Sequence, residues 1–353
     1  MIRPTGVEVQ RERSRRVAVL CGYRRGLTLL ELIVVLVILA ALGTVMITQT
    51  AGLTGEARYE STVRMLDQLQ DAVVGRQPVG SEDPTAVPPG FVSDMGRLPV
   101  AVLDGSSLTL AELWDGDLFN LTDDLFFRPR TLDGLDNDLE MFSGWRGPYV
   151  RLPIGTDRLA DGWGAGYQLE DGAGVGVTAA GDTIGSIRSD GSGLTGDVYN
   201  PALPLEVVML DTTQGIDRVN SSMPMDSLTV DFTVPAAGTG NGVVRLYGID
   251  NGEPVLLLQS DVFSVAGTAG DVVTVAVVFD DPSSPGTPLG AYPTVVGPKV
   301  LRAYAISGAT APPTDPTDAA AELSSQDKSV PVRFSLPAGG LNVLPTPLVL
   351  EGS

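Results

Sequence analysis

The most regular hydrophobic pattern in this chain of 353 residues is an apolar run close to its start. The run extends from Leu27 to Ile47, and Glu31 is its one charged position. As a helix that rises 1.5 Å per residue, it is long enough to cross a hydrocarbon layer about 30 Å thick. Residues 1–26 carry seven arginines and two glutamates. This basic flank predicts that the start of the chain stays on the cytoplasmic side and the remainder faces outward.

An amphipathic pattern follows the apolar run. Its apolar positions recur at steps of three and four residues, which predicts a helix with one buried stripe: Tyr59, Val63, Leu66, Leu69 and Val73. Gly52 and Gly55 lie between the two patterns and cost about 1 kcal/mol each relative to alanine in a helix. We therefore expect one long helix over residues 27–75, transmembrane in 27–47, with its second half packed on a globular domain.

The middle of the chain, residues 76–200, mixes short apolar segments with glycine and proline. A proline-rich loop is expected at 76–90, and short strands are expected at 165–170 and 182–188. Thr109 followed three residues later by Glu112 resembles a helix capping box, which predicts a short helix over 109–114. These elements indicate a small α+β domain.

Beyond residue 200 the pattern changes to short β-branched runs separated by turn residues. Residues 228–234 alternate strictly between apolar and polar side chains, which is typical of a half-buried strand. Similar runs predict strands at 205–210, 243–248, 255–260, 272–279, 299–306, 331–336 and 346–350, and a long loop at 308–328. About eight short strands favour a β-sandwich-like domain over residues 201–353. The expected fold class is α+β: a long N-terminal helix packed on a small antiparallel sheet, followed by an all-β domain.

Composition excludes several kinds of site. The chain has no histidine, and Cys21 is its one cysteine. Ser-His-Asp and Cys-His nucleophiles, histidine-based zinc sites and internal disulfides are therefore excluded. The net charge of −20 argues against a nucleic-acid partner. We expect a protein that is not an enzyme, and a membrane-anchored hydrolase is a weaker alternative.

The junction between the basic leader and the apolar run has a sequence like that of a known processing signal. Arg24-Arg25-Gly26 followed by Leu27-Thr28-Leu29-Leu30-Glu31 closely resembles the class III signal of type IV pilins and type II secretion pseudopilins. The resemblance implies that a prepilin peptidase removes residues 1–26 by cutting after Gly26 and then methylates the amino group of Leu27. Glu31 would be the fifth residue of the mature chain, as in that family. The first mature residue is more often Phe or Met, and this leader is longer than many.

Two other interpretations of the same segment are a secretory signal and an ordinary membrane anchor. A cleavable secretory signal usually has a shorter apolar region that ends in a small-residue site. An ordinary membrane anchor gains nothing from Glu31, because a carboxylate near the bilayer centre costs roughly 2.5–3.5 kcal/mol or more. The resemblance instead implies that Glu31 pairs with the amino group of Leu27 on an adjacent subunit. It also implies three partners: the prepilin peptidase, other pilin or pseudopilin subunits, and an inner-membrane assembly platform.

Two aromatic segments in the middle domain resemble the major pseudopilin of type II secretion. They run from Gly144 to Tyr149 and from Asp161 to Tyr167, and their matching residues are Trp145, Gly147, Pro148, Tyr149, Asp161, Trp163 and Gly164. The two tryptophans could form a platform that stacks on carbohydrate. We favour the other interpretation, in which they pack on the amphipathic helix.

Two acidic segments raise the question of calcium. Residues 189–197 look like a degraded form of the pseudopilin loop that binds one Ca²⁺, and Asp190 and Asp197 are the candidate ligands. Residues 133–140 form a second acidic cluster without EF-hand spacing. The alternative for both segments is a solvated turn.

Together these features predict a structural, minor subunit of a type II secretion pseudopilus or type IV pilus-like fibre. It would span the cytoplasmic (inner) membrane once, with its C-terminal domains in the periplasm or outside the cell. A bulky domain at 201–353 argues against a role as the main shaft subunit. The alternative is a binding or adhesion module, displayed on a membrane or fibre, that acts through the C-terminal β domain.

Overall fold

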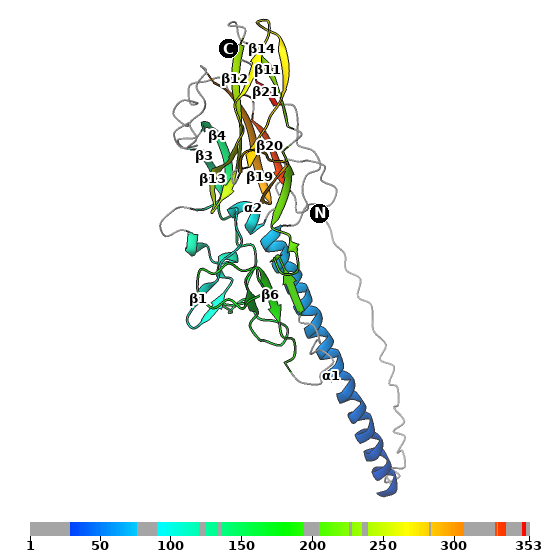
Figure 1. Ribbon diagram of the computed structural model, residues 1–353. Helices are drawn as coiled ribbons and strands as arrows, with labels where there is room; N and C mark the ends of the chain where they lie inside the picture. The colour runs from blue at the N-terminus through cyan, green and yellow to red at the C-terminus, as the bar shows by residue number, and fades with distance from the viewer. Residues whose placement is uncertain are drawn as a thin grey trace, which may run out of the picture. The chain divides into compact units, whose positions relative to one another are not determined.

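The structure is a computed structural model, shown in Figure 1. It describes residues 29–75, 90–119, 125–132, 136–193, 205–225, 228–234, 239–281, 284–306, 329, 331–336 and 348–350. The chain divides into two compact units, Met1–Thr54 and Gly55–Ser353, and each is described by itself. The predicted α+β class is confirmed, because an N-terminal helix is followed by a mostly β region with several antiparallel sheets.

Helix α1, Leu29–Val74, is the longest element (Figure 1). The helix continues without a break through both Gly52 and Gly55. In the first unit, its 18-residue stretch Leu29–Met46 is long and apolar enough to cross a membrane, and none of these residues is buried within the described structure. The predicted N-terminal apolar helix is therefore present, and it supports membrane association.

The second unit contains the amphipathic half of α1. Leu66, Leu69 and Val73, three positions of the predicted stripe, are buried in one hydrophobic core. This core also takes residues from α2, Phe91–Met95, and from a three-stranded antiparallel sheet. The sheet has the order β5-β6-β7, with bounds Gln168–Glu170, Ser186–Ser189 and Leu205–Val208. The amphipathic half of α1 therefore packs where the sequence predicts, against a small antiparallel sheet.

The segment around Thr109 differs from its prediction. Thr109 ends strand β2, Ser107–Thr109, which pairs with β1, Val102–Asp104. The helix that follows is a 3₁₀ turn, η1, Ala111–Leu113, without a side-chain cap, and a second 3₁₀ turn, η2, covers Gly116–Phe119. The predicted capping box is wrong because the carboxylate of Glu112 accepts hydrogen bonds from the Arg97 guanidinium and from the backbone N–H of Val100 instead.

The C-terminal strands form two facing sheets. The five-stranded sheet has the order β13-β12-β19-β20, with β14 also paired to β12; the bounds are β12 Thr239–Asp250, β13 Glu253–Gln259, β14 Phe263–Ala266, β19 Gly297–Ile306 and β20 Val332–Leu336. The three-stranded sheet has the order β15-β11-β21, with bounds Val272–Ala276, Thr229–Thr233 and Leu348–Leu350. Phe232 of β11 and Leu246 of β12 share one buried cluster, as in a β-sandwich.

Four strand pairs complete the described structure. Their bounds are β8 Leu210–Asp211 with β9 Ile216–Asp217, β10 Asn220–Pro224 with β18 Ala291–Val295, β16 Asp280–Asp281 with β17 Ser284–Pro288, and β3 Arg128–Leu132 with β4 Asp136–Ser143. The strand β4 corrects one expectation, since residues 136–140 of the second acidic cluster lie in a strand rather than in a turn. Leu139 and Met141 alternate inward along it and are buried.

The hairpin β3–β4 covers the second face of the five-stranded sheet. Leu139 and Met141 form a core with Tyr247 of β12 and Tyr304 of β19. Strand β12 therefore faces two cores, one on each side, and its apolar run is buried on both faces. The predicted division into domains at residue 200 stays a prediction. The hairpin β3–β4, which precedes residue 200, packs on β12 and β19, which follow it.

Candidate functional site

The first candidate site is the start of α1. Glu31 lies in the first turn of this helix and is exposed. A negative charge at this end of a helix is favourable because the backbone N–H groups there carry partial positive charge. The next charged residue along the chain is Glu56. Gly26 and Leu27 lie outside the described residues.

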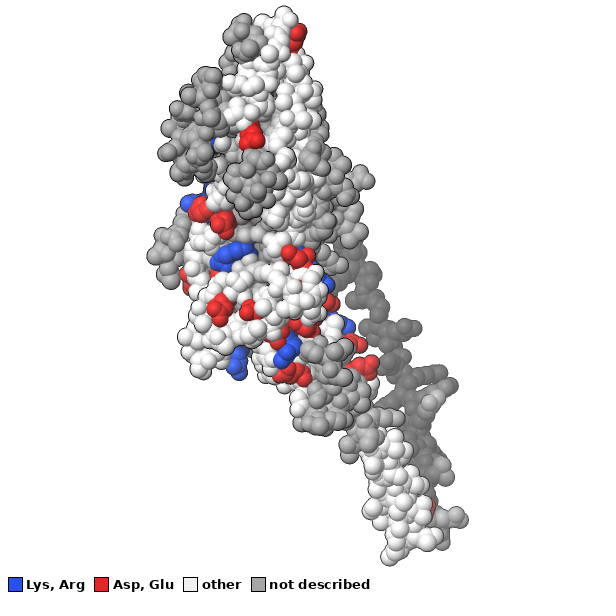
Figure 2. All heavy atoms as spheres, in the orientation of Figure 1, with Lys and Arg blue, Asp and Glu red and all other residues white. Residues whose placement is uncertain are grey.

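The side chains that follow Glu31 form an exposed apolar surface. Leu32, Leu36 and Leu39 are between 55% and 62% exposed, and their neighbours along the helix are similar. Apolar surface in contact with water costs roughly 25 cal/mol per Å² relative to burial. A helix of this kind is suited to lipid or to other apolar helices. On the face shown in Figure 2, acidic and basic side chains of the second unit are interspersed, while the described apolar half of α1 is almost free of charge.

A second group of residues fixes the amphipathic half of α1 to its own unit. The buried Thr62 donates a hydrogen bond from Oγ1 to the carbonyl of Arg58, at 3.0 Å. The same oxygen accepts one from the backbone N–H of Gly162, at 2.9 Å. A Cβ atom on Gly162 would lie 2.1 Å from the Arg58 carbonyl oxygen, so only glycine fits here. The Asp161–Gly164 turn is therefore a contact with the helix.

Asp161 holds this turn in shape. Its Oδ1 accepts hydrogen bonds from the backbone N–H groups of Trp163 and Ala165, at 3.0 and 2.8 Å. Its Oδ2 accepts one from the hydroxyl of Ser189, the last residue of β6, at 2.7 Å. Gly164 has a φ of +83°, a backbone conformation that favours glycine. The predicted motif residues Asp161, Trp163 and Gly164 thus form one structural turn, in which Trp163 is half-buried.

The Gly144–Tyr149 segment also lies in the core. Trp145 is 6% exposed, stacks on Phe119 at a ring distance of 5.6 Å, and donates a hydrogen bond from Nε1 to the Glu112 carbonyl. A Cβ on Gly147 would lie 2.6 Å from the Trp145 ring, and the Gly147–Pro148 peptide bond is cis. The buried ring of Trp145 packs with the core that contains α1, and it is not available to stack on a carbohydrate.

Asp94 is a buried carboxylate that the sequence did not single out. It accepts hydrogen bonds from Tyr149 Oη and Arg146 Nη2, both at 2.9 Å. Burial raises the pKa of Asp94 to about 6, against the opposing effects of Arg146 and of the hydrogen bonds from Tyr149 and Ser93. Burial and the nearby carboxylate also raise the pKa of Tyr149. This cluster connects α2 to the Trp145 segment, and nothing in the spacing of Asp94 marks it.

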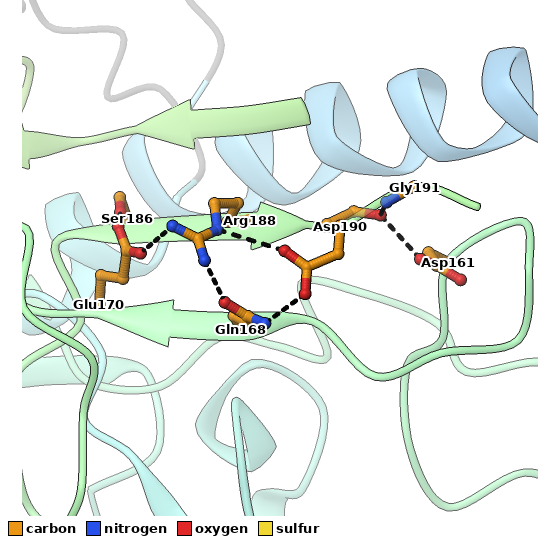
Figure 3. A network of polar contacts seen from close by, with 8 residues as sticks. Asp161, Gln168, Glu170, Ser186, Arg188, Asp190 and Gly191 are labelled. Carbon is orange, nitrogen blue, oxygen red and sulfur yellow. Dashed lines mark hydrogen bonds and ion pairs between the residues drawn. The ribbon is translucent and has the colours of Figure 1, made fainter. Parts of the chain in front are cut away.

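The candidate calcium ligand Asp190 belongs to a network with basic and amide partners (Figure 3). It accepts a hydrogen bond from Gln168 Nε2, and its other oxygen lies 3.6 Å from Arg188 Nε. Arg188 also pairs with Glu170, at 2.7 Å. These contacts compete with a metal ion for the carboxylate.

Asp197, the other candidate calcium ligand, lies outside the described residues. Among the residues that are described, no three Asp, Glu, His or Cys side chains gather where they could hold a metal ion. The described donors therefore do not fit a calcium site. Calcium at 189–197 stays a prediction.

One protein-family model matches the start of the chain. The model described as the prokaryotic N-terminal methylation motif matches residues 21–47, which include Gly26, Leu27 and Glu31. Neither the curated proteins nor the solved structures give a match to this chain. The motif and the apolar helix are consistent with a type IV pilin-like prepilin signal and indicate a precursor of the pilin or pseudopilin type. Such a motif implies processing by prepilin peptidase and assembly with other pilins.

Proposed function

We propose that this chain is a structural, minor subunit of a type II secretion pseudopilus or type IV pilus-like fibre. The observation that carries the proposal is the methylation motif at residues 21–47, placed on an exposed apolar helix whose one charge before Glu56 is Glu31. The precursor is cut after Gly26 in the cytoplasmic membrane. The mature chain spans that membrane once, and its β-rich region faces the periplasm or the exterior.

Assembly follows from the chemistry of Glu31 and the new amino terminus. In an apolar helix bundle an unpaired carboxylate is costly, and a cationic amine on a neighbour compensates it. Leu27 and Glu31 are four residues apart, about 6 Å along a helix axis. If each Glu31 pairs with the amino group of the next subunit, adjacent helices are therefore staggered by about one turn.

The remainder of the chain supports a display role without catalysis. The sequence has no histidine and one cysteine, which lies in the leader that is removed. The two-sheet β region is large for a subunit that would repeat along a fibre shaft, which supports a minor or terminal position. A binding or adhesion role for this region is the alternative, and it stays a prediction.

The test of processing is the intact mass and N-terminal sequence of the membrane-extracted protein, from cells with and without prepilin peptidase. We expect a chain that begins at Leu27, with one added methyl group, only when the peptidase is present. A chain that keeps residues 1–26 in both strains would contradict the proposal and leave an ordinary membrane anchor.

The test of assembly compares Glu31→Ala with Glu56→Ala. Both substitutions remove an exposed carboxylate from α1, but only Glu31 lies in the apolar half. We expect Glu31→Ala to insert in the membrane, to be processed, and to be lost from the sheared or cross-linked fibre fraction, while Glu56→Ala assembles normally. Normal assembly of Glu31→Ala would exclude the pairing mechanism.

A further inference from the structure

An apolar pocket lies between the hairpin β3–β4 and the strands β19 and β20. Its floor is formed by Met141 of the hairpin and by Val300 and Phe334 of the sheet, and these side chains are 2% or 3% exposed. Two of the residues that border it, Phe142 and Arg333, are exposed. Solvent therefore reaches a pocket whose floor is apolar.

The rim of the pocket carries aromatic surface. Phe142 is 54% exposed, while Met141 beside it in β4 is buried. The Phe142 ring stacks on Phe127, which also lines the pocket, at a ring distance of 5.8 Å. Large apolar side chains that stay exposed beside a pocket mark a surface that a partner covers. The pocket and the Phe127–Phe142 pair therefore form one apolar site.

Two guanidinium groups border this apolar site. Arg333 of β20 donates a 2.6 Å hydrogen bond from Nη1 to the carbonyl of Glu140, an acceptor without net charge. The Arg146 guanidinium carbon lies 4.0 Å from the centre of the Phe127 ring, and its Nη2 pairs with the carboxylate of Asp94. In the described part of the chain Arg333 has no such carboxylate partner. The rim is therefore positive, although the chain as a whole carries a net charge of −20.

The size of the pocket indicates what kind of group fills it. Its volume is about 160 Å³. Pockets that enclose free organic ligands usually have volumes of roughly 300–1,000 Å³, so this pocket is suited to one bulky side chain. A single apolar side chain that fills a pocket is the usual anchor of a contact between proteins. The positive rim favours acidic residues next to that anchor.

We propose that this pocket binds an acidic segment of a partner protein, which inserts one phenylalanine or leucine side chain against Met141, Val300 and Phe334. A carboxylate next to the inserted side chain pairs with Arg333, and the ring of Phe142 covers the inserted group. All residues of this site belong to the second unit, Gly55–Ser353. Binding here therefore does not depend on the apolar half of α1 or on assembly of a fibre.

The first experiment measures the binding of fluorescent peptides to the full chain in lipid nanodiscs, which keep detergent away from the apolar pocket. The peptide Gly-Asp-Asp-Phe-Asp-Asp-Gly should bind about tenfold more tightly than the same peptide with alanine in place of phenylalanine. A peptide with lysine in place of every aspartate should not bind, because the rim is positive. A phenylalanine–aspartate peptide that binds no more tightly than either of the other two would overturn the proposal.

Free phenylacetate tests the other kind of occupant, because it carries the same ring and one carboxylate. We expect it to displace the labelled peptide only at roughly hundredfold higher concentration than the unlabelled peptide does. Displacement at the same concentration would show that the pocket takes a small organic acid, and it would overturn the assignment to a protein segment.

Two variants locate the contact, and each has a matched control. Arg333→Glu should weaken binding of the phenylalanine–aspartate peptide about tenfold, while Arg158→Glu makes the same charge change at an exposed arginine outside the pocket and should leave binding unchanged. Phe142→Ala should also weaken binding about tenfold, while Val272→Ala, at another exposed apolar position, should not. All four positions are exposed, so these variants are expected to fold. Unaltered affinity in Arg333→Glu or in Phe142→Ala would overturn the site.

Discussion

The backbone N–H of Gly162 donates a 2.9 Å hydrogen bond to the side-chain hydroxyl of Thr62 on α1. The approach is so close that a Cβ on Gly162 would meet the carbonyl of Arg58 at 2.1 Å. The amphipathic half of α1 is therefore held to its unit by a direct contact between two backbones as well as by buried side chains.

The first prediction concerns Gly162→Ala. The added methyl group must displace either the helix backbone or the Asp161 turn, and overpacking of this kind costs about 1–3 kcal/mol. We expect a loss of about 2 kcal/mol in the free energy of unfolding, measured by urea denaturation of the detergent-extracted chain. Gly166→Ala is the matched control, because nothing lies within 4 Å of its added Cβ. Equal losses in the two variants would show that the close contact is not what restricts position 162.

The second prediction compares two ion pairs. The Glu112 carboxylate is 7% exposed and accepts hydrogen bonds from both Nη atoms of Arg97, at 2.7 and 2.9 Å. Glu112→Ala removes the carboxylate that neutralises Arg97, which keeps only the uncharged acceptors Asn251 Oδ1 and the Leu98 carbonyl, and it leaves the Val100 N–H without its Glu112 acceptor. We therefore expect a loss of about 3 kcal/mol in the free energy of unfolding.

The control for the second prediction is Glu60→Ala. Its partner Arg64 lies 3.1 Å away, but the two side chains are 55% and 77% exposed. An exposed pair of this kind contributes less than about 0.5 kcal/mol. A similar loss for both variants would contradict the burial argument.

The amphipathic stripe and several strands could be predicted from the sequence because their burial follows a local period. Leu66, Leu69 and Val73 recur at three and four residues and are buried as expected, and the alternation at 228–234 became β11. The motif around Gly26, Leu27 and Glu31 can be recognised because it is a short, contiguous run of residues. The family model for the methylation motif matches the same segment, residues 21–47.

The contacts between distant segments could not be predicted in this way. The acidic residues at 136–140 suggested a turn, while Leu139 and Met141 are buried because strand β12, about one hundred residues later, supplies their partners. The burial of Asp94 and of Arg245 likewise depends on residues far away in the chain. The short strands β10 and β18 show no strict alternation of apolar and polar residues that would have marked them.

The third prediction follows from the buried Asp94. Its pKa is raised to about 6 from 3.8, so between these values the folded state holds more protons than the unfolded state. The contribution of Asp94 to stability therefore falls as pH rises toward 6 and stays low above it. Asp94→Asn removes this contribution. Between pH 5 and pH 8, the free energy of unfolding of the unaltered chain should therefore fall by about 1 kcal/mol more than that of Asp94→Asn.

Asp67→Asn controls for the third prediction, because it removes a negative charge from the exposed face of α1. Urea denaturation at the two pH values is the measurement for all three proteins. An Asp94→Asn variant with the pH dependence of the unaltered chain would show that this carboxyl group does not titrate between pH 5 and 8.

The fourth prediction concerns Lys299, which is 2% exposed and donates a 2.7 Å hydrogen bond to the carbonyl of Val295. Burial lowers its pKa to about 7 from 10.5, so the unfolded state binds the proton more tightly. Stability therefore rises with pH between about 7 and 10.5, and the cost of the buried charge is complete below 7. Lys299→Met fills a similar volume without charge and should raise the free energy of unfolding, more at pH 6 than at pH 9. The control is Arg333→Met at an exposed position, which should show no such difference between the two pH values. A Lys299→Met variant that is less stable than the unaltered chain at pH 6 would contradict the prediction. It would mean that the hydrogen bond to Val295 outweighs the cost of burying the ammonium group.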